Sequence, residues 1–176
     1  AIDLLGKGQI ADLPTAITEL WKNGYDAYAT RLFCDLFVEG YKGIRNPLLL
    51  ISDNGYGMSM QDLEEKWIVI GTESKTGDIS APPPELRFNL PARVPMGEKG
   101  IGRLSVAFLG HQTFMLTKKR GMPCQALFLD WRILENPFLF LDEVDIPIRE
   151  VKSKDQLNPV LYTLLDDFRQ NLLNRK

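Results

Sequence analysis

The sequence predicts an α/β fold in which helices cover one face of a mixed β-sheet, as a two-layer sandwich. Helix-like and strand-like segments follow one another in the order helix, strands, helix, loop, helix, strands, helix. The 176 residues suit one domain with one core, so we treat residues 1–176 as a single domain. A composition of 44% hydrophobic and 25% charged residues is typical of a soluble globular protein.

The first helix is predicted over residues 12–29, where apolar and aromatic side chains recur at helical spacing and Pro14 stands near the start. Gly24 lies inside this helix, where glycine costs roughly 1 kcal/mol relative to alanine. We therefore expect another part of the chain to approach the helix closely at Gly24.

Two strands are predicted next, at residues 30–40 and at the apolar run 46–52, which we expect to be buried. Ser59 is placed to cap a short helix over residues 59–71. Residues 72–100 then contain five prolines and little periodicity. A stretch of that length in a compact domain is usually a lid, a binding loop or a disordered segment.

The second half of the chain contains the remaining elements. An apolar helix is predicted over residues 100–110, and two strand-like runs, 111–119 and 123–131, form a hairpin. Another strand is predicted within residues 137–148. Residues 158–176 form an amphipathic helix whose apolar stripe consists of Leu161, Leu164, Leu165, Phe168 and Leu172.

Charge and cysteine content exclude several classes of function. The net charge of -2 shows no overall bias toward nucleic acid, and the basic stretch TKKRG, Thr117–Gly121, is expected to be a solvated loop. Cys34 and Cys124 lack the spacing of a zinc site, and the single histidine, His111, is expected to be structural. We expect buried free thiols and a reducing, cytoplasmic location. No apolar run reaches the roughly 20 residues that a membrane span needs.

A polar stripe lies on the first predicted helix. Glu19, Asn23 and Asp26 are spaced by four and three residues, which places them on one helical face. A solvated helix face is one interpretation of this stripe. An amide between two carboxylates would also suit Mg²⁺, which prefers oxygen ligands.

The stretch SDNGYGM, Ser52–Met58, follows the second predicted strand directly. One interpretation is a hairpin, because Asn-Gly is a common turn dipeptide. The other is a base-binding turn. Asp53 would accept a hydrogen bond from the exocyclic amine of adenine, Gly55 and Gly57 would leave room for a flat ring, and Met58 would offer an apolar contact.

The stretch GEKGIG, Gly97–Gly102, opens the predicted helix at 100–110. Glycines at a helix N-terminus allow backbone N–H groups to converge on a phosphate. The spacing Gly-x-x-Gly-x-Gly differs from that of a dinucleotide-binding fold and from that of a P-loop. An ordinary glycine-rich turn is the alternative interpretation.

Taken together, in this order, these stretches resemble the GHKL ATPases. This group includes the ATPase subunit of DNA gyrase, the ninety-kilodalton heat-shock chaperones, mismatch-repair MutL and the sensor histidine kinases. ELWKNGYDA, Glu19–Ala27, is similar to the N box of this group, DNGYGM to its Asp-x-Gly-x-Gly box, and GEKGIG to its Gly-x-x-Gly-x-Gly box. GTESKTG, Gly71–Gly77, is similar to a chaperone segment with a phosphate-facing lysine. The resemblance runs from about Pro14 to Gly110 and looks closest to bacterial chaperone-like and MORC-like ATPases.

The resemblance implies a Bergerat-type fold and a set of roles around Mg-ATP. Glu19 would be the general base, Asn23 would hold Mg²⁺, and Asp53 would bind the adenine amine. Residues 76–96 would form the ATP lid. The further nucleotide-binding residues that it implies are Asp26, Ala27, Gly57, Met58, Lys75, Gly97, Lys99, Gly100, Ile101 and Gly102.

The implied function is slow ATP hydrolysis that drives lid closure and dimerisation of a larger protein. A nucleotide-sensing module without turnover, or an unrelated α/β interaction domain, is an alternative. The late-strand Gly-Thr pair of the family is missing, with Thr163 as a weak substitute. The family also needs a second domain, so we expect this chain to be the N-terminal part of a longer protein. Its partners would be a nucleotide and a second copy, with nucleic acid bound only through further domains.

Overall fold

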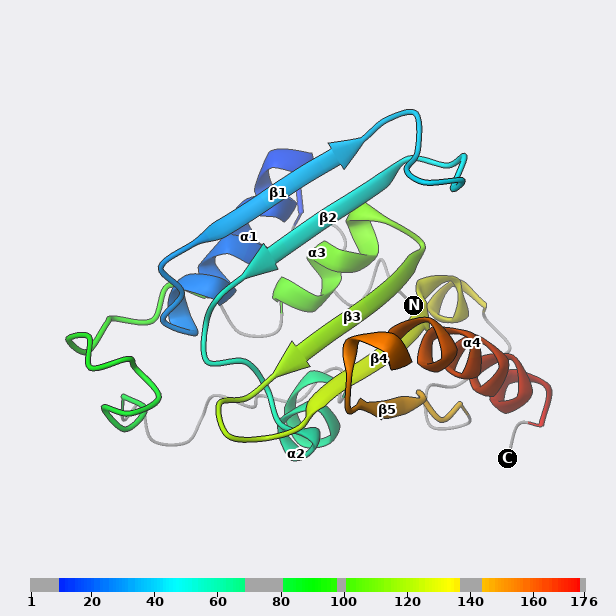
Figure 1. Ribbon diagram of the computed structural model, residues 1–176. Coiled ribbons are helices and arrows are strands. Elements are labelled where there is room, and N and C mark those ends of the chain that lie inside the picture. The colour runs from blue at the N-terminus through cyan, green and yellow to red at the C-terminus, as the bar shows by residue number, and fades with distance from the viewer. Residues whose placement is uncertain (1–9, 69–80, 98–100, 137–143, 175–176) are drawn as a thin grey trace.

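The computed structural model describes residues 10–68, 81–97, 101–136 and 144–174. Four helices and five strands form the frame of the described part of the chain (Figure 1). In chain order they are α1 (Leu13–Asp26), β1 (Leu32–Phe37), β2 (Leu48–Asp53), α2 (Met60–Asp62), α3 (Ile101–Leu109), β3 (Gln112–Lys118), β4 (Cys124–Asp130), β5 (Ile148–Val151) and α4 (Leu157–Leu173). Short helical turns add Leu63–Trp67, Trp131–Glu135 and Lys154–Gln156.

The strands pair in two antiparallel groups. β1 pairs with β2, so that Leu32 lies opposite Asp53, and β4 pairs with both β3 and β5. Figure 1 shows α1 behind β1 and β2 and next to α3, whereas α4 lies against β4 and β5. The predicted α/β class is confirmed, and so is the predicted hairpin of β3 and β4.

The main core surrounds β4. The residues Ala126 to Leu129 are all buried, and because successive strand residues point to opposite faces, both faces of β4 are covered. Phe128 contacts Phe168 of α4 edge to face, with ring centroids 5.4 Å apart. A smaller cluster of Ile10, Ala16 and Leu104 joins α1 to α3. The core thus fixes α3 and the β3–β4 hairpin relative to α1.

Side chains cap the starts of α1 and α2, and the cap predicted at Ser59 is confirmed. Asp12 caps α1 by accepting the backbone N–H of Thr15 at 2.8 Å, and Pro14 lies in the first turn. Ser59 and Asp62 form a capping box at α2, in which each side chain bonds the backbone of the other. The helix predicted from Ser59 is described only as far as Ile68.

Three local predictions are corrected by the structure. β2 is not buried, because α1 covers only one of its faces and Leu50 on the other face is 50% exposed. The predicted strand at 137–148 lies partly outside the described residues, and β5 begins at Ile148 because Pro147 has no N–H for a sheet hydrogen bond. Cys34 and Cys124 are unpaired thiols as expected, but they are half-buried.

Within the described ranges, the structure contains no helix that is both long and apolar enough to cross a bilayer.

Candidate functional site

The C-terminal half of α1 lies directly against the end of β2 and the turn that follows it. A Cβ atom at Gly24 would stand 2.4 Å from Leu32 Cδ2 and 3.3 Å from Asp53 Cβ. A Cβ atom at Gly55 would stand 2.7 Å from the carbonyl oxygen of Ala27. The close approach expected at Gly24 is therefore present, and glycine at these two positions permits it.

The backbone of the turn after β2 is held from two sides. The N–H of Tyr56 donates to the carbonyl of Ala27 at 2.9 Å, and its carbonyl accepts the N–H of Arg120 at 3.3 Å. The N–H of Met58 donates to Thr117 Oγ1 at 2.9 Å. Between them, Gly57 has a φ of +69° and passes close to Lys118. The turn thus joins α1 to the end of the β3–β4 hairpin.

Asp53 and Asn54 use their side chains differently. Asp53 Oδ1 accepts the N–H of Gly55 at 2.8 Å, which organises the turn itself. The side-chain oxygen of Asn54 accepts the N–H groups of Thr30 and Arg31 at 2.9 and 2.8 Å. Because β2 pairs with β1 and is followed by α2, Asn54 and Gly55 do not form a hairpin turn, and that interpretation is excluded.

Glu19 and Asn23 lie on α1, one helical turn apart. The Glu19 side chain is only 12% exposed, and Lys22 Nζ lies 2.5 Å from its Oε1. Asn23 is exposed. Among the described residues, His, Cys, Asp and Glu form no group of three that could hold a metal ion. A metal bound here would keep waters as ligands beside Asn23, as Mg²⁺ commonly does.

Asp26, the last residue of α1, contacts the segment that precedes the glycine-rich stretch. Its Oδ1 accepts the N–H of Met96 at 2.8 Å, and its Oδ2 accepts the N–H of Gly97 at 2.9 Å. Charged acceptors make the stronger class of hydrogen bond. Asp26 therefore ties the first glycine of that stretch to the end of α1.

Arg93 reaches the same end of α1. Its Nη1 donates to the carbonyls of Tyr25 at 2.8 Å and Ala29 at 3.1 Å. Its guanidinium lies 4.6 Å from the Tyr25 ring centroid and 5.1 Å from that of Tyr28. A cation at a helix C-terminus also meets the negative end of the helix dipole.

The end of α1 has an unusual backbone at Tyr28. The N–H of Ala29 donates to the carbonyl of Gly24, and that of Tyr28 to Tyr25, each at 2.9 Å, which is the Schellman pattern. Glycine normally occupies the left-handed position of this motif, but here Tyr28 has a φ of +60°. This conformation costs a non-glycine residue roughly 1–2 kcal/mol. The surrounding contacts of the 2% exposed Tyr28 hold it there.

Asp62 links α2 to the β3–β4 hairpin. Lys119 Nζ lies 2.7 Å from its Oδ2 and Lys66 Nζ 2.5 Å from its Oδ1, and Ser59 donates to it as well. Burial alone would raise the pKa of Asp62, but the hydrogen bonds from Lys119, Lys66 and Ser59 hold it well below its usual range. The carboxylate is therefore ionised at neutral pH and fixes α2 beside Met58.

The remaining predicted residues are only partly described. Lys75, Lys99 and Gly100 lie outside the described residues, as do residues 76–80 of the predicted lid. Ile101 and Gly102 are the first two residues of α3. The described part of the predicted lid contacts the β3–β4 hairpin through Arg120, which donates to the Glu85 carbonyl at 2.9 Å.

A profile of the family described as "Histidine kinase-, DNA gyrase B-, and HSP90-like ATPase" matches residues 11–158. This chain belongs to that ATPase family. The resemblance based on the sequence boxes is thereby confirmed, and the boxes from Glu19 to Gly102 all fall within the matched range.

The ATPase domain also has a curated relative. It is 27% identical over 119 residues to the protein named "Putative type II restriction enzyme HgiDII" from Herpetosiphon aurantiacus, a match that covers 68% of this chain. The matched region makes up 17% of the relative, so the chain spans only a small part of that protein's length. Membership in the ATPase family indicates a nucleotide-binding domain.

Sequence reasoning missed several residues of the ATPase domain. Thr117 and Arg93 lie far along the chain from the residues that they contact, so no local pattern indicated them. Thr163 does not replace the missing late-strand threonine, because it lies on α4 and donates to the carbonyl of Pro159 at 3.0 Å.

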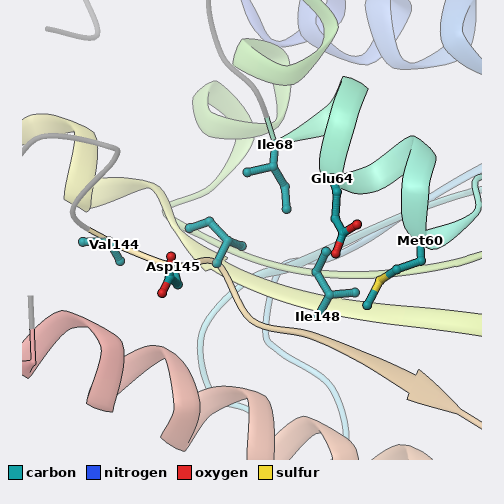
Figure 2. Close-up of a pocket in the computed structure, with 7 residues that line it drawn as sticks. Met60, Glu64, Ile68, Val144, Asp145 and Ile148 are labelled. Carbon is teal, nitrogen blue, oxygen red and sulfur yellow. The ribbon is translucent and has the colours of Figure 1, made fainter. Parts of the chain in front are cut away.

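A groove of about 370 Å³ lies elsewhere on the ATPase domain, between α2 with its helical continuation and the segment before β5. Figure 2 shows Met60, Glu64 and Ile68 pointing from the helical side toward Ile148. No residue that lines it is one of the predicted site residues. Its lining consists of Met60, Glu64, Ile68, Val144, Asp145, Ile146 and Ile148.

Proposed function

We propose that this domain binds ATP with Mg²⁺ at the C-terminal half of α1 and, within a longer protein, hydrolyses it slowly. The observation that carries this proposal is the contact between α1 and the turn after β2. It brings Asp53, the proposed base-binding residue, next to the helix that carries Glu19 and Asn23. A base end and a metal end would then belong to one site.

At the base end, one carboxylate oxygen of Asp53 accepts a hydrogen bond from the protein and the other could accept one from a base. Oδ1 accepts the N–H of Gly55, whereas Oδ2 has no hydrogen-bond partner within the described residues. An exocyclic amine of adenine would donate to Oδ2. Ala27, Gly57 and Met58 would form the walls of the base pocket, and the Tyr56 bonds to Ala27 and Arg120 would keep these walls in place.

At the phosphate end, the proposal uses Asn23 and the glycine-rich stretch. Asn23 would supply one oxygen ligand to a Mg²⁺ that bridges phosphate oxygens when bound. The N–H groups of Gly100, Ile101 and Gly102 would face the phosphates at the start of α3, whereas the N–H of Gly97, which precedes them, donates to Asp26. Lys75 and Lys99 would add positive charge near the phosphates.

Hydrolysis would depend on Glu19 as the general base that activates water. In the described structure Lys22 lies 2.5 Å from Oε1 of Glu19, so one oxygen of the base is engaged and the other would have to activate water. This pairing supports slow turnover. In the longer protein, the lid at 76–96 would close over the γ-phosphate and favour dimerisation, because closed and open states contact the nucleotide differently.

The same ion pair favours a second candidate function. If Lys22 keeps Glu19 paired, the domain would bind nucleotide and signal its presence to a partner without significant turnover. Measured phosphate release separates the two functions, because only the first requires it.

The longer protein would act with further domains. The relative named as a restriction enzyme suggests nucleic acid as a partner of such domains. The net charge of -2 on this chain argues neither for nor against that contact. We propose that the nucleotide bound to this domain controls the activity of such a longer protein on nucleic acid.

Calorimetric titration tests the proposed site directly. The 176-residue chain would be titrated with a non-hydrolysable ATP analogue and with ADP, each with and without Mg²⁺. We predict that both nucleotides bind and that Mg²⁺ raises the affinity for the ATP analogue. An Asn23→Ala variant should lose that strengthening, whereas Asn171→Ala on α4 should keep it. The absence of binding by either nucleotide would overturn the proposal.

A further inference from the structure

We infer that Arg93 and Asp26 are positioning residues that fasten the segment 81–97 to the C-terminal end of α1 and so fix the start of the glycine-rich stretch. This inference rests on the proposed function, since that stretch is its phosphate-binding element. Neither residue needs to touch the nucleotide in this role. Both would act through the backbone that they hold.

The first attachment is made by Arg93. Its guanidinium binds the carbonyls of Tyr25 and Ala29 and lies against the rings of Tyr25 and Tyr28. Its backbone N–H donates to the Tyr28 hydroxyl at 3.0 Å. A planar guanidinium can stack and donate in its plane at once, which a lysine ammonium cannot do. Arg93 is therefore held by its side chain and its backbone together.

Tyr28 is shaped for this attachment. Its left-handed backbone turns the chain out of α1, and the residue is only 2% exposed. Its ring contacts the guanidinium of Arg93, and its hydroxyl accepts the backbone N–H of Arg93. Glycine would fit the backbone more easily but would lack the ring and the hydroxyl. The contacts that its ring and hydroxyl make with Arg93 give a physical reason for a tyrosine at this strained position.

The second attachment is made by Asp26. Both of its carboxylate oxygens accept backbone N–H groups, from Met96 and from Gly97. These attachments lie three and four residues after Arg93 and meet the same helix end. The segment therefore cannot slide along α1 without breaking both attachments. Asn23, one helical turn before Asp26, is thereby held at a fixed place relative to Gly97.

The inference makes a prediction that separates positioning from general stability. A loosened segment would displace the phosphate-binding N–H groups but would leave the base pocket of Asp53 and Met58 intact. Loss of either attachment should lower the affinity for ATP and leave the affinity for adenosine, which has no phosphates, almost unchanged. A general loss of stability of the domain would lower the affinity for both ligands together.

Hydrogen exchange on the chain without nucleotide tests the fastening itself. In the unsubstituted chain the amides of Met96 and Gly97 should be protected. Asp26→Ala should accelerate their exchange about tenfold or more, because both amides lose their acceptor. Arg93→Ala should do so as well, whereas the matched variants Asp35→Ala and Arg45→Ala, both at exposed positions, should not. Unchanged exchange in Asp26→Ala and Arg93→Ala would overturn the inference.

Titration tests the consequence for the ligand. Arg93→Ala and Asp26→Ala should each weaken the ATP analogue by about tenfold, the scale of one charge-assisted hydrogen bond, with adenosine affinity unchanged. Arg93→Lys should not restore the affinity. If the alanine variants fail to fold, Tyr28→Phe serves in their place. It removes one hydroxyl and keeps the ring, so it should lower the affinity for the ATP analogue by a smaller factor. Equal weakening of adenosine and the analogue would contradict positioning.

The two proposals can fail separately. If the unsubstituted chain binds neither nucleotide nor adenosine, the proposed function is overturned, and the hydrogen exchange still decides whether Arg93 and Asp26 fasten the segment. If it binds nucleotide and the variants bind equally well, only the positioning inference is overturned.

Discussion

The Oδ1 atom of Asp53 accepts the backbone N–H of Gly55 at 2.8 Å, and Oδ2 has no hydrogen-bond partner within the described residues. Because Oδ1 is used, Oδ2 is the atom that would bind a base in the proposed site. Oδ2 would attract the amine of adenine and repel the carbonyl oxygen that guanine carries at the same place. We expect ADP to bind at least tenfold more tightly than GDP, by calorimetry under identical conditions. Equal affinities would exclude this role for Asp53.

Substitution of the proposed base should separate binding from chemistry. Glu19→Ala should leave the affinity for the ATP analogue intact and lower phosphate release by roughly a hundredfold or more, the usual contribution of a general base. Glu39→Ala, at an exposed turn position, is the matched control and should change neither quantity. Turnover that survives in Glu19→Ala would show that another group activates water.

The ion pair between Lys22 and Glu19 makes a further prediction. Lys22→Ala removes the partner of Glu19, so phosphate release should rise if the pair restrains the base. A fall in phosphate release would instead indicate that Lys22 supports the reaction. No phosphate release in either form of the chain would favour the nucleotide-sensing function.

Two glycines with positive φ offer a matched test of the turn after β2. Gly57 and Gly43 have φ values of +69° and +91°. A Cβ atom at Gly57 would stand 2.2 Å from the Lys118 carbonyl oxygen, whereas one at Gly43 would meet no atom within 4 Å. Gly43→Ala should cost about 1 kcal/mol of unfolding free energy, and Gly57→Ala roughly 3 kcal/mol through the added overlap. Urea unfolding measures both, and equal costs would contradict the close packing at Gly57.

The capping box at α2 should make stability depend on pH. Because the folded pKa of Asp62 lies below its unfolded value, its contribution is fully present above about pH 4. This contribution is lost as pH falls toward the folded pKa. Asp62→Asn should therefore lower the unfolding free energy by about 1–2 kcal/mol at pH 7 and by less at pH 3. A difference that grows toward pH 3 would contradict the ionised pairing with Lys66 and Lys119.

Local sequence signals predicted most of the frame. Pro14 and Ser59 marked helix starts because such signals lie within the first turn of a helix, and Gly24 indicated a close approach because glycine is costly inside a helix. The glycine-rich boxes predicted the family because their order along the chain is specific. These signals depend on neighbours in sequence, which is why they could be interpreted without a structure.

Other features depend on contacts between distant residues. Arg93 lies in a proline-rich stretch with no periodicity, yet it binds the end of α1, 64 and 68 residues earlier in the chain. Thr117 supports Met58 across 59 residues. The exposure of β2 follows from which face α1 covers, a fact that the apolar run alone does not contain.

The most direct test of the proposed nucleotide site compares the unsubstituted chain with Asp53→Asn in one calorimetric titration with the ATP analogue and Mg²⁺. With the N–H of Gly55 bound to its side-chain oxygen, the substituted side chain would direct its NH₂ group at the adenine amine, where two donors repel each other. We predict binding by the unsubstituted chain and no measurable binding by Asp53→Asn, with both proteins equally folded by circular dichroism. Retention of the same affinity in Asp53→Asn would show that the adenine does not bind at this turn.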